Sequence, residues 1–182
     1  MASAAMECIE RFSAENPTFS ETTSSWDDVS QQHATIPFDE LPLAKRAWLS
    51  PSRPVRWTLG WDMVAQRDVA IPSLLVGMDA VGTARGAGNP FQTGSNGLSS
   101  GNNFLEALNG GLLEIVERDA VACQRHAWNV AARAIPRVRL ASITHPAVCD
   151  LLARFKRAGV AAVVFDCTTD TQVPVYMAYL LD

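Results

Sequence analysis

A single uninterrupted helical pattern, from about Asn103 to Val130, is the best-defined element in the sequence. Either Asn102 or Asn103 is suited to cap its N-terminus, because a short polar side chain there can accept a hydrogen bond from the first turn. Glu106 falls within that first turn, as it does in a capping box. The sequence therefore predicts a long helix whose start is fixed by side chains.

Helical and extended segments alternate along the rest of the chain. Residues 16–52 are rich in Ser, Thr, Pro and acidic residues, and we expect a loop-rich insertion there, with one short helix and with Trp26 and Phe38 as anchors. The remaining pattern predicts helices over 3–14 and 145–158 and strands over 56–63, 69–78, 160–167 and 173–181. We therefore expect an α/β (α+β) fold in which mixed β-sheets pack with helices.

Both ends of this arrangement lack a neighbour that a packed element normally has. The first helix has no preceding strand or cap, and the strand over 173–181 is followed by no turn or covering helix. We expect residues 1–182 to form a single partial domain, incomplete at both ends.

Composition narrows the class of protein. The 182 residues are 48% hydrophobic and 19% charged, with a net charge of −4, which suits one globular domain without a basic surface for nucleic acid. The apolar runs are far shorter than the roughly 20 residues that cross a bilayer. Cys8, Cys123, Cys149 and Cys167 lie far apart in a sequence without an export signal, so we expect buried thiols in a reducing cytosol. We expect a cytoplasmic protein that binds neither nucleic acid nor membranes.

The pattern E-x-x-E-R occurs twice, at residues 7–11 and 114–118. Two carboxylates three residues apart on a helix lie about 5 Å from each other on one face, which is close enough to hold one divalent cation. The alternative is an ordinary surface ion pair between Glu and Arg four residues apart. One copy alone would favour the ion pair, and two copies on apolar helices leave both interpretations open.

Along the long helix, Glu106 and Glu117 are eleven residues apart and share a face, whereas Glu114 is rotated by about 60°. Eleven residues rise about 16 Å, which is too far for one ion. The spacing suits an extended ligand with several oxygens and more than one metal ion. A polyphosphate with Mg²⁺ fits this description, because Mg²⁺ prefers carboxylate and phosphate oxygens.

The segment from Gly94 to Asn102 is rich in glycine and leads directly into the long helix. The free N–H groups and the positive dipole at a helix N-terminus favour an anion. The segment is not a P-loop, because Gly-Lys-Ser/Thr is absent, and by itself it is typical of a tight turn. Since it precedes a helix with three glutamates, it predicts the phosphate end of a nucleotide site.

The three histidines, His33, His126 and His145, each stand alone, and we expect structural roles for them. Cys123 and His126 are three residues apart but lack the other two ligands of a zinc site. The five tryptophans are mostly not interleaved with basic residues, so we expect core or interface anchors.

Two stretches of the sequence resemble the YcaO family. The first is Ser3-Ala-Ala-Met-Glu-Cys-Ile-Glu-Arg-Phe-Ser-Ala14, which is similar to that family's S-x-x-x-E-x-x-E-R helix. The second runs from Ser95-Asn-Gly-Leu-Ser-Ser-Gly-Asn102 through Glu106 to Glu114-Ile-Val-Glu-Arg-Asp119. The resemblance extends loosely over nearly all of the chain.

The resemblance implies an enzyme that uses ATP and Mg²⁺ to activate a backbone amide of a peptide. In that family a nucleophile adds to the carbonyl, the oxygen is phosphorylated, and phosphate leaves. An internal Cys, Ser or Thr side chain gives an azoline, external sulfide gives a thioamide, and an amine gives an amidine. The implied activity is that of a cyclodehydratase or thioamide-forming enzyme acting on ribosomally made peptides or proteins.

The resemblance also implies site residues, motif by motif. The implied magnesium ligands are Glu7, Glu10, Glu114 and Glu117. The implied nucleotide contacts are Ser3, Ser99, Asn102, Glu106 and Arg118.

The implied partners are a peptide or protein substrate, a second copy in a homodimer, and an E1-like or TfuA-like protein. A whole YcaO domain is about twice this length, so we expect weak or no catalysis by the 182-residue chain alone. Two alternatives stay open. The chain could be a catalytically inactive module for peptide docking or dimer formation, or its carboxylates could be solvated helix faces in an unrelated α/β protein.

Overall fold

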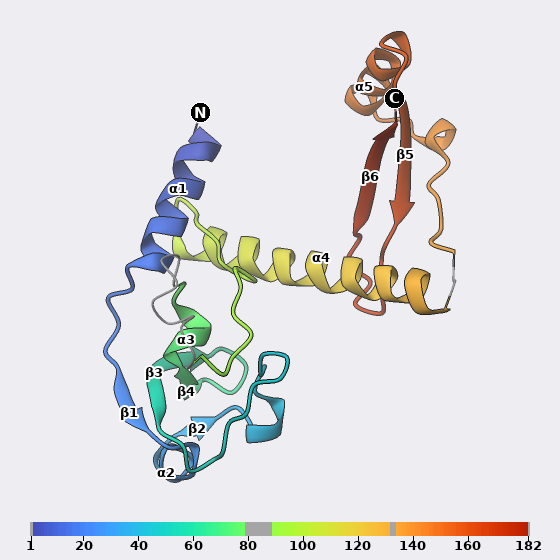
Figure 1. The fold of residues 1–182 in the computed structure, drawn as a ribbon. Coiled ribbons are helices and arrows are strands. Elements are labelled where there is room, and N and C mark those ends of the chain that lie inside the picture. Colours follow the sequence, from blue (N-terminus) through green and yellow to red (C-terminus); the bar gives the residue numbers. More distant parts are fainter. Residues whose placement is uncertain (1, 79–88, 132–133, 182) are drawn as a thin grey trace. The chain divides into compact units, whose positions relative to one another are not determined.

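The computed structural model describes residues 2–78, 89–131 and 134–181, and the chain divides into two compact units, Met1–Ala107 and Leu108–Asp182. Figure 1 labels the elements. The first unit holds α1 (Ala2–Glu15), β1 (Thr22–Ser24), α2 (Trp26–Gln32), β2 (Ala34–Thr35), η1 (Phe38–Glu40), β3 (Val55–Asp62), β4 (Arg67–Pro72) and α3 (Ser73–Val76). The helix α4 (Phe104–Ala131) begins there and continues into the second unit, with η2 (Leu140–Ser142), α5 (Pro146–Arg157), β5 (Ala161–Asp166) and β6 (Tyr176–Leu181).

A four-stranded sheet organises the first unit. Its strand order is β1-β3-β4-β2, with β2 parallel to β4 and the other neighbours antiparallel. Next to the sheet, Val29 of α2 packs with Trp57 and Ala70 in a buried cluster. The predicted α/β class with a mixed sheet is therefore confirmed.

Residues 16–52 contain more regular structure than their composition predicts. Both edge strands of the sheet, β1 and β2, come from this segment. The expected short helix is α2, which begins after Ser25, whose hydroxyl accepts a 3.1 Å hydrogen bond from the Asp28 N–H. Strands of three and two residues are too short to show a period in the sequence, so only their pairing with β3 and β4 defines them.

The strand predicted over 69–78 is wrong at its C-terminal end. β4 stops at Pro72, and Ser73–Val76 forms α3 instead. Proline has no N–H to donate to a ladder, so it ends the pairing. The side chains of Leu74 and Leu75 then pack against the buried cluster of Leu41, Leu49 and Phe91.

In the second unit, α4 packs against the β5–β6 hairpin. The two strands are antiparallel, with Ala161 opposite Leu181 and Asp166 opposite Tyr176. Their core is the cluster of Ala120, Ile135, Cys167 and Val175, in which Ala120 comes from α4. The predicted helix over 145–158 is confirmed as α5, with Pro146 at its first position and Gly159, at φ 75°, beyond its end.

The turn after β5 is held by Asp166. Its carboxylate accepts a 3.0 Å hydrogen bond from the Thr168 N–H. Hydrogen bonds from the Thr168 hydroxyl and from this N–H hold the pKa of Asp166 below its ordinary value. Burial, and secondarily the charge of Asp166, raise the pKa of the neighbouring Cys167 thiol. The two pKa shifts therefore favour an ionised Asp166 carboxylate beside a protonated, buried Cys167 thiol.

The prediction of buried thiols is wrong for three of the four cysteines. Cys8, Cys123 and Cys149 are exposed, on α1, α4 and α5, and Cys167 is buried. A thiol is small, so its exposure leaves little apolar area in water, and larger side chains decide which helix face packs.

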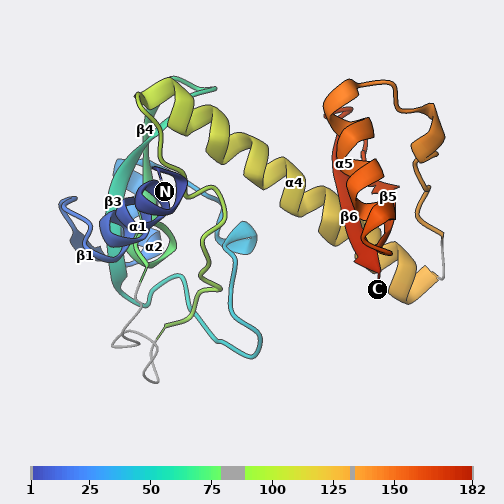
Figure 2. The same ribbon diagram turned by 90° about the horizontal axis from the view of Figure 1, so that it is seen from above.

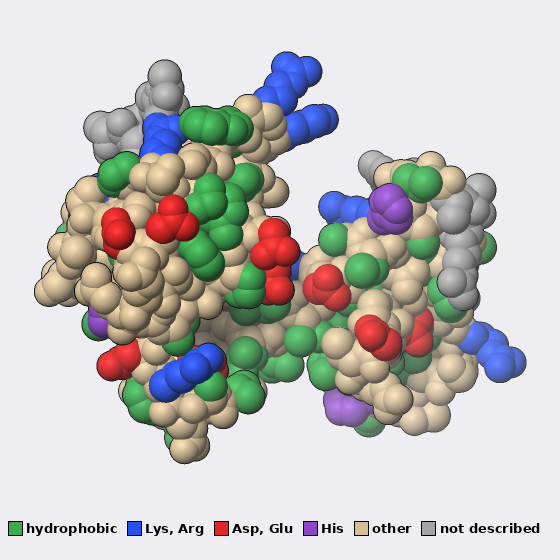
Figure 3. Space-filling model, turned by 90° about the horizontal axis from the view of Figure 1, so that it is seen from below, with side chains coloured by type: hydrophobic (Ala, Val, Ile, Leu, Met, Phe, Trp, Pro, Cys, Tyr) green, Lys and Arg blue, Asp and Glu red, His purple; other side chains and the backbone are tan. Residues whose placement is uncertain are grey.

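Larger apolar side chains also reach the surface, as Figure 3 shows in green. The five tryptophans differ in burial. Trp57 is buried and Trp26 is half-buried, whereas the side chains of Trp48, Trp61 and Trp128 are exposed. None of the described helices combines the length and the apolar character that crossing a bilayer needs.

Candidate functional site

Two polar side chains meet at the N-terminus of α4. The Glu106 carboxylate accepts a 3.1 Å hydrogen bond from the Asn102 N–H and bonds of 3.1 and 3.2 Å from the Asn102 side-chain amide. The Asn103 side-chain oxygen accepts a 3.0 Å bond from the Glu106 N–H. Asn103 therefore caps the helix, and Asn102 fixes the carboxylate of Glu106 over its positive end, where a negative charge is stabilised.

Two glycines let the preceding segment approach α4 closely. A Cβ on Gly101 would lie 2.5 Å from the Ala107 nitrogen, and Gly97 has a φ of 77°. The Leu98 N–H donates to the Ser95 carbonyl at 3.1 Å, which closes a tight turn. Ser99 is half-buried, and its hydroxyl donates to the Ser100 carbonyl at 3.4 Å. The more N-terminal glycines of this region, at 82, 86 and 88, lie outside the described residues.

The first pair of acids lies on α1. Glu7 is exposed and Glu10, almost one turn further on, is half-buried. Neither side chain forms a hydrogen bond or an ion pair within the described part of the chain, although Glu7 and Arg11 have the spacing of a helical ion pair. Ser3 belongs to the first turn of α1, and its side chain is outside the described part. In both ribbon views the segment that leads into α4 passes beside α1 (Figures 1 and 2).

The second pair of acids lies on the part of α4 that belongs to the second unit. The Arg118 guanidinium lies 2.6 Å from the Glu114 carboxylate, which is half-buried. Glu117 is exposed. The contact of Arg118 with Glu114 is the ordinary helical ion pair that the sequence also allowed.

Within either unit, the described residues contain no group of three or more His, Cys, Asp or Glu side chains that could hold a metal ion. The structure brings Asn102 to Glu106 and Arg118 to Glu114. The magnesium and nucleotide roles of the candidate residues stay predictions.

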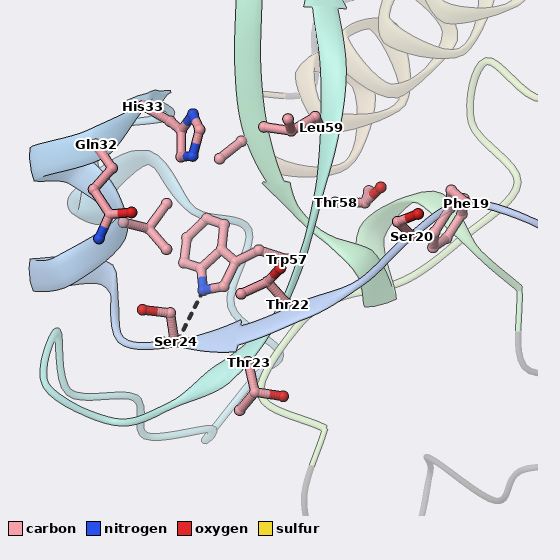
Figure 4. Close-up of a pocket in the computed structure, with 12 residues that line it drawn as sticks. Phe19, Ser20, Thr22, Thr23, Ser24, Gln32, His33, Trp57, Thr58 and Leu59 are labelled. Atoms are coloured by element: carbon pink, nitrogen blue, oxygen red, sulfur yellow. Dashed lines mark hydrogen bonds between the residues drawn. The ribbon is translucent and has the colours of Figure 1, made fainter.

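Sequence reasoning missed a cavity of about 420 Å³ in the first unit. The cavity lies between α2, β1 and β3, and its lining includes His33 and the indole of Trp57 (Figure 4). The Trp57 Nε1 donates a 2.9 Å hydrogen bond to the Ser24 carbonyl and so ties β3 to β1. The Ser and Thr residues between 20 and 25 are the signal in the sequence that marks this place.

Comparison with known proteins identifies the family. Residues 1–182 match the family described as "YcaO cyclodehydratase, ATP- and Mg²⁺-binding", and the chain belongs to the YcaO family. An uncharacterized protein in the tfuA 3′ region of Rhizobium leguminosarum bv. trifolii is 33% identical over 192 residues, which covers 100% of this chain and 42% of that protein. The chain thus spans less than half the length of this relative.

Solved structures share the fold. A heterocyclase in complex with substrate and cofactor superimposes with a TM-score of 0.80 at 20% identity, covering 98% of this chain and 26% of that chain. The YcaO protein of Methanopyrus kandleri bound with AMPPCP and Mg²⁺ has a TM-score of 0.60 at 23% identity, covering 99% of this chain and 46% of that chain. The partial-domain expectation is consistent with these coverages.

Proposed function

We propose that the chain is part of an ATP- and Mg²⁺-dependent enzyme that phosphorylates peptide backbone amides, for azoline or thioamide formation in ribosomally made peptides or proteins. The observation that carries the proposal is the N-terminus of α4, where Asn102 holds the Glu106 carboxylate through three hydrogen bonds. Membership of the YcaO family supports a cyclodehydratase-type enzyme, and the relative bound with AMPPCP and Mg²⁺ supports the two cofactors.

The side chains of the proposed site fit these cofactors. Carboxylate oxygens are preferred by Mg²⁺, and a glycine-shaped segment at a helix N-terminus suits phosphate. In our proposal the magnesium ligands are Glu7, Glu10, Glu114 and Glu117. The nucleotide contacts are Ser3, Ser99, Asn102, Glu106 and Arg118.

ATP, when bound, supplies the phosphoryl group that turns the amide oxygen of the peptide into a leaving group. A thiol, hydroxyl or sulfide adds to the carbonyl carbon, and the former carbonyl oxygen takes the phosphoryl group. That oxygen then departs as phosphate while a C=N or C=S bond forms, and the amide nitrogen or the sulfur loses its proton. The chain's own residues bind and orient: Asn102 fixes Glu106, and Gly101 lets the segment before α4 lie against its first turn.

The proposed partners are a peptide or protein substrate, a second copy of the chain, and an E1-like or TfuA-like protein. The relative from the tfuA 3′ region supports a TfuA-like partner. We place the reaction in the cytoplasm.

A second candidate is a catalytically inactive YcaO-like module for peptide binding or dimerisation. The ion pair between Arg118 and Glu114 favours it, because a carboxylate that is already paired with a guanidinium needs no metal ion. The two candidates differ in turnover, since only the enzyme releases phosphate from ATP in the presence of a peptide.

Calorimetric titration of the whole natural protein with ATP and Mg²⁺, followed by an assay of peptide-dependent phosphate release, separates the candidates. We expect saturable binding that requires Mg²⁺ and that Glu117→Ala weakens at least tenfold, because loss of one carboxylate leaves the metal ion under-coordinated beside the phosphates. Equal affinity in the wild type and the variant would contradict the proposed role of Glu117. Binding without phosphate release would favour the inactive module.

A further inference from the structure

The cavity of the first unit lies where two strands separate. β1 pairs with β3 only from Val55 to Trp57, although β3 continues to Asp62. Beyond this point the chain that precedes β1 turns away from β3, as Figure 4 shows at Phe19 and Ser20. The cavity occupies the resulting wedge and is closed on the third side by the end of α2.

No strand of the described part of the chain pairs with the edge of β3 that borders this wedge. Within the described residues, the neighbours of β3 in the sheet are β4 on one side and the short β1 on the other. Antiparallel pairs alternate between hydrogen-bonded and non-hydrogen-bonded, and Pro72, opposite Trp57, has no N–H to donate. By this alternation the backbone N–H and C=O groups of Leu59 and Trp61 point away from β4, toward the open edge.

The side chains along this edge are apolar and exposed. The exposed fractions of Leu59 and Trp61 are 54% and 60%. Natural proteins protect a free strand edge with charged side chains or proline, and an unprotected apolar edge invites pairing with another strand. The edge of β3 at Leu59 and Trp61 carries no such protection.

Among the described residues that line the cavity beside the edge, none is Asp, Glu, Lys or Arg. Its floor is apolar, with Val29, Trp57 and Ala70, and hydroxyl groups such as those of Thr22 and Thr58 lie around it. Burial of a charge there would be costly, since the described lining offers no carboxylate, ammonium or guanidinium group to pair with it. The cavity therefore suits an uncharged side chain.

We propose that an extended segment of the peptide substrate pairs with the edge of β3 from Thr58 to Asp62 and places an uncharged side chain in the cavity between α2, β1 and β3. Main-chain hydrogen bonds to Leu59 and Trp61 supply affinity that is independent of sequence, and the cavity selects one side chain. This inference rests on the proposed function, because only that function makes the bound peptide a substrate. It involves none of the residues of the proposed nucleotide site.

The test uses a phage-displayed library of linear dodecapeptides, selected on the whole natural protein in the absence of ATP, with binding of labelled peptides measured by fluorescence anisotropy. Leu59→Pro removes the outward N–H, and Leu59→Val is the matched control that keeps it. We expect Leu59→Pro to weaken selected peptides at least tenfold and Leu59→Val less than threefold. Thermal unfolding of both variants shows whether the fold is retained, and Trp61→Pro with Trp61→Val gives a second pair if Leu59→Pro unfolds.

N-methylation of the selected peptides, one backbone nitrogen at a time, gives an independent result. A strand that pairs through one edge uses every second N–H, so we expect loss of binding with a period of two. A flat response to N-methylation, equal binding to the proline and valine variants, or recovery of no binding peptide would each overturn the proposal. Loss of self-association in Leu59→Pro, measured by sedimentation, would assign the edge to a second copy of the chain and would also overturn it.

Failure of this proposal is distinguishable from failure of the proposed function. Peptide binding is measured without nucleotide, and nucleotide binding is measured by calorimetry without peptide. If peptides bind as expected but the protein has no affinity for ATP, the proposed peptide site on β3 is supported and the proposed enzymatic function is contradicted. Once the natural peptide is known, competition with the selected peptides shows whether the occupant is the substrate, and absence of competition contradicts that assignment.

Discussion

Arg118 Nη2 lies 2.6 Å from Glu114 Oε1 on α4, and Arg154 lies 2.8 Å from Asp150 on α5 with the same spacing of four residues. The first pair is proposed to lie in a ligand site, and the second is not. Ion pairs that remain in contact with solvent, as both of these do, contribute below about 1 kcal/mol to stability. The two pairs therefore form a matched comparison in which stability and ligand binding can be separated.

Neutralising Glu114 should affect ligand binding more than folding. We expect Glu114→Gln to lower the free energy of unfolding by less than about 1 kcal/mol and to weaken Mg²⁺-dependent ATP binding of the whole protein at least tenfold. Asp150→Asn should produce a similar small change in stability and leave ATP binding unchanged. Equal effects of the two variants on ATP affinity would assign Glu114 a structural role alone.

Gly101 is expected to be indispensable for the approach of its segment to α4. Gly101→Ala places a Cβ 2.5 Å from the Ala107 nitrogen, so the backbone has to move, which costs about 1–3 kcal/mol as overpacking does elsewhere. Gly94→Ala is the control, because a Cβ there has nothing within 4 Å. Urea unfolding followed by circular dichroism measures both. A Gly101→Ala protein as stable as Gly94→Ala would show that the segment does not lie against the helix.

The N-cap of α2 offers a test of the first unit. Ser25→Ala removes the hydroxyl that accepts from the Asp28 N–H, and loss of such a cap lowers stability by about 1 kcal/mol. Ser25→Thr, which keeps the hydroxyl that accepts this hydrogen bond and that donates to the Asp28 carboxylate at 2.6 Å, should retain most of the stability. Differential scanning calorimetry would show a lower Tm for the alanine variant alone. Identical transition temperatures for both variants would speak against the cap.

Stability should fall in acid through Asp166. Its pKa is lowered in the folded state from the ordinary 3.8, so its contribution is fully present above the unfolded pKa and is lost as the pH falls through the folded pKa. We expect urea midpoints of the wild type to drop more steeply below about pH 4 than those of Asp166→Asn. Asp170→Asn, on an exposed residue of the same turn, should retain the wild-type slope. Parallel curves for wild type and Asp166→Asn would contradict this assignment.

The sequence predicts long, periodic elements well and short ones poorly. The helix over 103–130 was found within one residue at each end, because its period and its asparagine cap are local properties. β1 and β2 were missed, since strands this short exist only through their partners, and α3 was missed because Pro72 ends a strand whose apolar run continues. Cysteine burial also failed, since the packing of a helix face depends on tertiary neighbours.

In the candidate site, too, the contacts that follow from a local sequence pattern are predictable and the features that depend on tertiary structure are not. The contact of Asn102 with Glu106 follows from a capping pattern, and the pairing of Glu114 with Arg118 follows from helical spacing. The same spacing on α1, at Glu7 and Arg11, gives no ion pair within the described residues. The cavity at Trp57 is marked in the sequence only by the Ser and Thr residues between 20 and 25, because its shape depends on where one strand leaves another.

The surface thiols of Cys8, Cys123 and Cys149 bear on every measurement of self-association. Accessible thiols can be oxidised by air to disulfides between molecules, so two copies can become linked without any specific interface. Covalent coupling of this kind would imitate the proposed homodimer in a sizing experiment. A dimer that persists in reducing agent, and in a variant with these three cysteines changed to serine, is the species that reflects the fold.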